Sequence, residues 1–208
     1  MGLKLRILSL WTPKWFQRRG LNELAHQTTH GLKKLLDDQL DNDSESGPPF
    51  PKVDMVLKGS LDERRKIMAI THNKLVETLI KTMGRDEAIE KGREAMFMEG
   101  LSLGGKFKGI LGVEESLEDL FTAAGILYKV LGIEFSIKAV ENSKEDKITM
   151  VVSHCNLAEY YTPDTCRILS AADEGVVQGL NPRIQIKFTE RITEGCSECL
   201  APIKVDVV

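Results

Sequence analysis

The chain has 208 residues, of which 42% are hydrophobic and 28% are charged, a composition ordinary for a globular protein. Its formal net charge of −3 argues against a nucleic-acid-binding protein, because affinity for phosphates rests on a basic surface. No apolar run approaches the roughly 20 residues that cross a bilayer, so we predict no transmembrane segment. Pro13 and Lys14 interrupt the short apolar stretch near the start, so we expect no signal peptide and a cytoplasmic location.

Residues 1–59 differ from the rest of the chain. They open with basic and aromatic residues, including Trp11 and Trp15, and continue with a helical apolar periodicity over residues 21–40. The acidic, proline-containing segment 41–51 has the composition of a linker. We therefore predict a helical arm and linker. For the aromatic start, packing on its own domain or on a second subunit is favoured over an interfacial membrane anchor, and a homodimer is expected.

The strongest helix signals lie in residues 60–131. Ser60 and Glu63 have the spacing of a capping box, and Ser116 begins another helix with acidic residues in its first turn. The glycine-rich segment 100–112 predicts the end of a helix followed by a mobile loop. This segment lacks the GK[ST] ending of a phosphate-binding loop, so it does not indicate a nucleotide site.

After Gly132 the hydrophobic pattern changes from helical to alternating. It predicts two hairpin strands, a helix and two further strands, at residues 133–140, 147–154, 162–180, 183–192 and 199–207. The fold class is therefore α+β, with N-terminal helices packed on a C-terminal antiparallel sheet of order β-β-α-β-β. We expect a single domain over residues 60–208, with helices in 60–131 and the sheet in 132–208.

All four cysteines lie in the last part of the chain, at predicted element ends. Cys155 ends the second strand, Cys166 is in the first turn of the following helix, and Cys196 and Cys199 flank the last turn at CxxC spacing. If the strand ends share one edge, four thiolates converge, which is the ligand set of structural zinc. We therefore predict a zinc site on Cys155, Cys166, Cys196 and Cys199.

Three other interpretations of the cysteines stay open. The same four thiolates suit an iron–sulfur cluster. Cys166 at a helix N-terminus would have a lowered pKa and act as a nucleophile. In that case the nearby Glu159, Tyr160, Tyr161 and Asp164 would supply acid–base groups, although rim residues of a loop are the favoured interpretation of these side chains. Finally, the cysteines can be buried without any ligand, and no catalytic residue is assigned.

Five motifs in the second half carry a family resemblance. They are LEDLFTAAGILYKVLG, VVSHC, PDTC, NPRIQIKFTERI and EGCSEC. Their order resembles the 4-vinyl reductase domain superfamily and the related L-2-amino-thiazoline-4-carboxylate hydrolase family. The resemblance implies helices against an antiparallel sheet, often in a dimer, with small-molecule binding in relatives. One departure is Cys196, which follows Gly195 where the family turn has aspartate, and which favours metal binding over the family's hydrolase chemistry.

The leading functional prediction is a metal-binding domain of the 4-vinyl reductase type, with the four-cysteine zinc site and a pocket for a small apolar or amphipathic ligand. The first alternative is a metal- or thiol-dependent hydrolase of the amino-thiazoline carboxylate type. The second alternative is a dimeric interaction scaffold.

Overall fold

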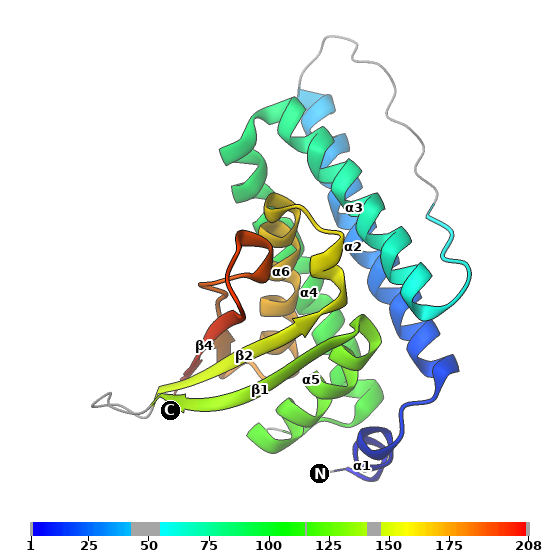
Figure 1. The fold of residues 1–208 in the computed structure, drawn as a ribbon, viewed down its shortest axis with the longest axis vertical. Coiled ribbons are helices and arrows are strands. Elements are labelled where there is room, and N and C mark those ends of the chain that lie inside the picture. The colour runs from blue at the N-terminus through cyan, green and yellow to red at the C-terminus, as the bar shows by residue number, and fades with distance from the viewer. Residues whose placement is uncertain (1, 43–54, 115, 141–146, 207–208) are drawn as a thin grey trace.

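The structure (Figure 1) is a computed structural model that describes residues 2–42, 55–114, 116–140 and 147–206. Most of the expected linker and the expected hairpin turn lie outside these residues. The described helices are α1 (Leu3–Leu10), α2 (Lys14–Asn42), α3 (Leu61–Met83), α4 (Arg85–Leu111), α5 (Leu117–Leu131) and α6 (Pro163–Leu180). None of these helices combines the length and the apolar character that a membrane span requires.

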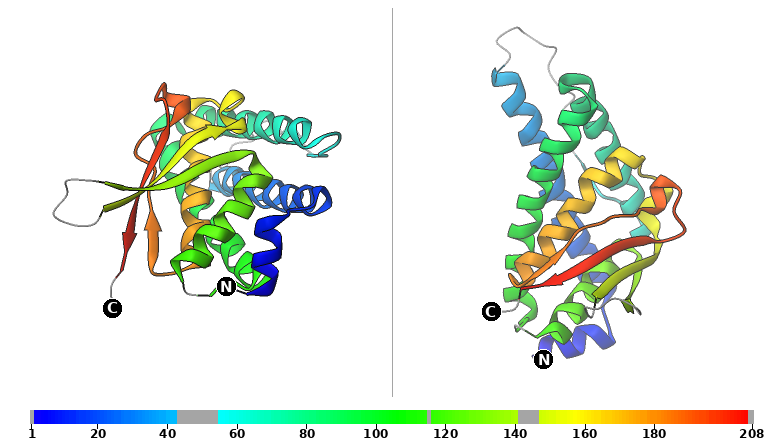
Figure 2. Two further views of the ribbon diagram at one scale, coloured as in Figure 1. Left: turned by 60° about the horizontal axis from the view of Figure 1, so that its bottom comes forward. Right: turned by 90° about the vertical axis from the view of Figure 1, so that its left-hand side faces the viewer.

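The strands form one antiparallel sheet. They are β1 (Ile133–Val140), β2 (Lys147–Cys155), β3 (Ile184–Ile186) and β4 (Cys199–Val205), in the spatial order β1-β2-β4-β3. Short 3₁₀ turns, η1 (Asn156–Glu159) and η2 (Ile192–Glu194), follow β2 and precede β4. The helices gather on one side of the sheet (Figure 2), which confirms the predicted α+β class. Neighbouring β2 and β4 place Val152 opposite Cys199.

Side-chain caps fix the helix starts where the sequence predicts them. Ser60 Oγ accepts a hydrogen bond from the Glu63 amide at 3.3 Å, and Glu63 Oε2 accepts one from the Ser60 amide at 2.7 Å. Ser116 accepts from the Asp119 amide in the same way. Each cap satisfies amides that have no partner within the helix. The start of α3 is also tied to the end of α5, because the buried Arg65 donates to the Val130 carbonyl.

The prediction of a helix end and loop at residues 100–112 is wrong, because α4 continues through this glycine-rich segment. The glycines allow α4 and α6 to touch backbone to backbone. A methyl group on Gly100 would overlap the carbonyl of Ala172, and one on Gly175 would overlap the carbonyl of Phe97. Glycine lowers helix propensity, but at this crossing it permits a contact that no larger residue allows.

The strand predicted over residues 183–192 is shorter than expected. Its ladder with β4 is regular only over Ile184–Ile186 and resumes as a single bridge from Glu190. Between these points the Phe188 amide donates to the Glu174 carboxylate at 3.1 Å instead of to β4. A side chain of α6 therefore interrupts the strand.

Candidate functional site

An interior cavity of about 90 Å³ lies between the helices and the ends of β1 and β2. Its wall is mainly apolar, with buried Leu24, Met68 and Leu103 among the lining residues. The polar and titratable residues that line it are Thr28, His72, Cys155, Tyr161, Cys166, Ser170 and Asp173. These residues come from α2, α3, β2, α6 and the loop before α6. Convergence of such groups on one apolar cavity marks it as the candidate site.

Asp173 is the unusual member of this group. It lies in the middle of α6, and its carboxyl makes neither a hydrogen bond nor an ion pair with any residue that the structure describes. Burial raises its pKa from the ordinary 3.8 to about 7, and the neighbouring charge of Glu174 adds to the rise. By surface area the residue is half-buried, and it lines the cavity. An unpaired carboxyl in a cavity wall is a candidate for ligand binding or proton transfer.

His72 and Tyr161 form a fixed pair beside the cavity. Nδ1 of His72 lies 2.8 Å from the Tyr161 hydroxyl, and Nε2 lies 3.0 Å from Thr28 Oγ1. The Thr28 hydroxyl already donates to the Leu24 carbonyl at 2.8 Å, so it accepts from His72. Nε2 therefore carries the proton, and Nδ1 accepts from Tyr161. Burial lowers the pKa of His72 to about 3, so its ring is neutral at physiological pH.

The structure brings two of the four cysteines to the cavity. Burial raises the pKa of Cys155 to about 12 and that of Cys166 to about 11. The expected lowering of the Cys166 pKa at a helix N-terminus is therefore wrong, because loss of solvation outweighs the helix dipole. Both thiols are protonated at neutral pH.

The other two cysteines lie outside the cavity wall. Cys196 follows η2, and Cys199 begins β4, where its sulfur accepts from the Ile192 amide at 3.3 Å. Within the described ranges, which contain all four cysteines, no three His, Cys, Asp or Glu side chains are grouped to hold a metal ion. The zinc site on Cys155, Cys166, Cys196 and Cys199 thus has no support from this geometry and stays a prediction.

Of the acid–base candidates in the sequence, Tyr161 reaches the cavity. Asp164 instead pairs with Arg85 at 2.7 Å. The sequence reasoning missed Asp173 as a site residue. A signal was present, because residues 166, 170 and 173 are spaced to share one face of a helix. Cys166 and Asp173 therefore point to the same cavity.

The sequence matches the model of one protein family. The family model of L-2-amino-thiazoline-4-carboxylic acid hydrolase matches residues 64–201. The chain belongs to this family. The match confirms the resemblance read from the motifs, and it includes the cavity residues from His72 to Asp173. No curated protein sequence is significantly similar to this family member.

One solved structure shows that this fold recurs in a distant protein. Subunit 3 of the trafficking protein particle complex from Naegleria fowleri, covalently bound to palmitic acid, is 14% identical, with a TM-score of 0.54. The similarity covers 69% of this chain and 95% of that subunit. The phenol-responsive sensory domain of the transcription activator PoxR is 13% identical over 73% of this chain and 76% of its own, with a TM-score of 0.49.

Proposed function

We propose that the protein hydrolyses a small ring that carries an amidine and a carboxylate, such as L-2-amino-thiazoline-4-carboxylate, in its interior cavity. The observation that carries this proposal is the unpaired Asp173 carboxyl with a pKa of about 7. A carboxyl whose pKa lies near the working pH can take up a proton and return it within one reaction cycle. Membership of the hydrolase family supports the same reaction class.

The charge of Asp173 also suits the proposed substrate. A ring amidine is cationic when protonated, and an ionised carboxylate in an apolar cavity attracts it more strongly than one in water. The cavity of about 90 Å³ is smaller than the roughly 300–1,000 Å³ of typical ligand pockets, so it excludes a peptide or a sugar chain and limits the substrate to a very small molecule.

In the proposed reaction, water attacks the amidine carbon while the Asp173 carboxylate accepts its proton. The new carbon–oxygen bond forms as one ring bond at that carbon breaks, and the electron pair of the broken bond stays on the departing ring heteroatom. Asp173 then returns the proton to that heteroatom. As the new carbonyl forms, the hydroxyl proton of the intermediate leaves to solvent, which balances the proton that the cationic amidine carried, so one water is consumed. Tyr161, held by His72, borders the same space.

A thiol nucleophile is the less favoured route. With a pKa of about 11, only about one Cys166 in ten thousand is a thiolate at pH 7. The Cys155 pKa of about 12 makes that thiolate rarer still. Both thiols are therefore assigned to the cavity wall.

The proposal is tested by incubating the full chain with L-2-amino-thiazoline-4-carboxylate and following the ring-opened product, heavier by one water, by mass spectrometry. Asp173→Asn keeps the side-chain size but cannot carry the proton, and we expect it to lose about 10²-fold or more in rate. Lys81→Gln, exposed on α3 and outside the cavity, keeps the wild-type rate. A folded wild-type protein without turnover, or full activity in Asp173→Asn, would contradict the proposal.

The zinc site is retained as a second candidate because electrostatic interactions connect its four cysteines in series. Cys166 raises the pKa of Cys155, Cys199 raises that of Cys166, and Cys196 raises that of Cys199. Elemental analysis of protein purified without added metal is the test. About one zinc per chain, lost on Cys199→Ser, supports the site, and several irons with visible colour indicate a cluster instead. Metal-free, folded protein contradicts both.

We further propose a homodimer in the cytoplasm, as expected from the sequence. Light scattering after size-exclusion chromatography gives twice the chain mass if this is correct and the single chain mass if it is wrong.

A further inference from the structure

The segment from Leu3 to Arg19 carries an exposed apolar surface, here called the N-terminal face. Its apolar members, with their exposed fractions, are Leu3 (75%), Ile7 (53%), Leu10 (82%), Trp11 (70%) and Trp15 (66%). In α1 the opposite side holds the helix to the body, because Leu5 is fully buried. The outward row at positions 3, 7 and 10 is one helical stripe. Large exposed apolar patches of this kind mark interaction surfaces.

The N-terminal face is also basic. Residues 3–19 hold five Lys and Arg residues and no Asp or Glu, in a chain whose net charge is −3. All five are exposed, and they are Lys4, Arg6, Lys14, Arg18 and Arg19. The positive charge is therefore concentrated beside the exposed apolar side chains.

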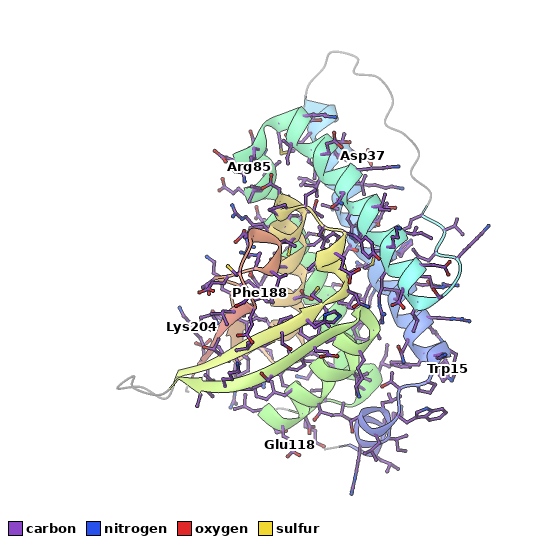
Figure 3. All side chains as sticks on the ribbon, in the orientation of Figure 1. Trp15, Asp37, Arg85, Glu118, Phe188 and Lys204 are labelled. Carbon is purple, nitrogen blue, oxygen red and sulfur yellow. The ribbon has the colours of Figure 1, made fainter. Side chains whose placement is uncertain are left out.

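A groove of about 410 Å³ continues this face between the start of α2 and the end of α4. Trp15, Phe16, Phe107 and Ile110 line it, and Ile110 is itself 54% exposed. Figure 3 places Trp15 at the outer side of the molecule, at the start of α2 and near α1. The apolar surface thus extends from α1 onto the body of the protein.

We propose that the N-terminal face docks the protein on the surface of an anionic lipid bilayer. Leucine, isoleucine and tryptophan side chains insert at the boundary between headgroups and acyl chains, while lysine and arginine contact lipid phosphates. A second copy of the chain fits less well. A two-fold contact through this face would set the five cations against their own copies, with no acidic residue in the segment to offset them.

The test uses the full chain and its own fluorescence. Trp11 and Trp15 are the two tryptophans of the sequence, so every tryptophan signal comes from this face. Vesicles of phosphatidylcholine with phosphatidylserine are expected to shift the emission to the blue and to carry the protein into the pellet. Neutral phosphatidylcholine vesicles bind more weakly, and added salt weakens binding to the anionic vesicles.

Two variants separate the charge from the apolar contribution. Arg18→Gln with Arg19→Gln is expected to lower partitioning onto anionic vesicles about 25-fold, and Leu10→Ser to lower it about tenfold or more. Lys81→Gln and Met98→Ala, exposed residues on α3 and α4, serve as controls and change partitioning little. Circular dichroism verifies that each variant is folded.

The proposal is overturned if folded wild-type protein does not bind anionic vesicles, or if the N-terminal variants bind as well as the controls. It is also overturned if Leu10→Ser splits an oligomer and vesicles leave the tryptophan emission unchanged, because the face is then a protein–protein interface.

Discussion

Asp173 and Glu174 are adjacent in α6, yet their carboxyl groups meet opposite surroundings. Glu174 accepts hydrogen bonds from Arg93 at 2.8 Å and from the Phe188 amide at 3.1 Å. Asp173 faces the cavity without such a partner in the described structure. Neighbouring positions on a helix point about 100° apart, so one carboxylate supports the fold while the other lines the cavity.

The first prediction concerns stability and pH. Below about pH 4 the Asp173 carboxyl is protonated in both the folded and the unfolded protein. Between about pH 4 and 7 only the folded protein keeps this proton. Stability of the wild type relative to Asp173→Asn therefore falls as pH rises through this window, by at most roughly 4 kcal/mol. Urea unfolding of both proteins at pH 4 and pH 8 measures the change. A constant difference would show that Asp173 is not desolvated.

The second prediction concerns the hydrogen bond between Tyr161 and His72. Tyr161→Phe leaves the buried Nδ1 without its donor, and we expect a loss of about 1–3 kcal/mol in the free energy of unfolding. Tyr160→Phe is the matched control, expected to change stability by less than about 0.5 kcal/mol because the buried His72 ring is bonded to the hydroxyl of Tyr161 instead. Equal effects of the two changes would mean that the bond is not formed in solution.

The third prediction tests the close contact of α4 with α6. Gly100→Ala places a methyl group against the Ala172 carbonyl, and overpacking of this kind costs about 1–3 kcal/mol. Gly105→Ala lies on the same helix with open space around the new methyl group, so it is expected to stabilise by about 0.5–1 kcal/mol. Thermal unfolding of both variants should therefore show shifts of opposite sign.

The fourth prediction concerns thiol reactivity. Cys155 and Cys166 are protonated and partly buried, so iodoacetamide at pH 8 is expected to label them slowly in the native protein. In urea both label at the rate of an ordinary cysteine, and peptide mass spectrometry compares the two conditions. Rapid native labelling of Cys166 would restore it as a candidate nucleophile.

Local signals in the sequence account for most of the secondary structure. The caps at Ser60 and Ser116 depend on residues three positions apart, and the alternation after Gly132 depends on neighbours along one strand. Such features are readable because the interacting groups are close in sequence. Family membership was readable for the same reason, from short motifs in order.

Features that depend on a distant partner were not readable. In the sequence alone, the glycines near Gly100 predict the end of a helix. They are compatible with a continuous α4 because α6, which begins at Pro163, packs against them. The length of β3 depends on Glu174 reaching the Phe188 amide. Local patterns could not reveal either contact.

The candidate site was predicted in part. Cysteine spacing drew attention to Cys155 and Cys166, which do meet at the cavity, and Tyr161 was a named acid–base candidate. The CxxC pair lies outside the wall, and the sign of the Cys166 pKa shift was wrong, because burial is a property of the whole fold. Asp173 was missed because two adjacent acidic residues in a helix normally indicate a solvent-exposed face.

The glycine contact of α4 with α6 also bears on how the proposed substrate would reach Asp173. Two helices that meet through their backbones have no flexible side chains at the crossing to absorb sliding or tilting, so this side of the cavity acts as a fixed wall. Another part of the wall consists of the side chains of Met68 and His72 from α3 and of Leu157 from η1. For the proposed substrate, we expect entry and product release on the part of the wall that side chains close. If the proposed function is correct, substitutions in this part of the wall change turnover through the rate at which the cavity opens, and they leave the Asp173 carboxyl unchanged.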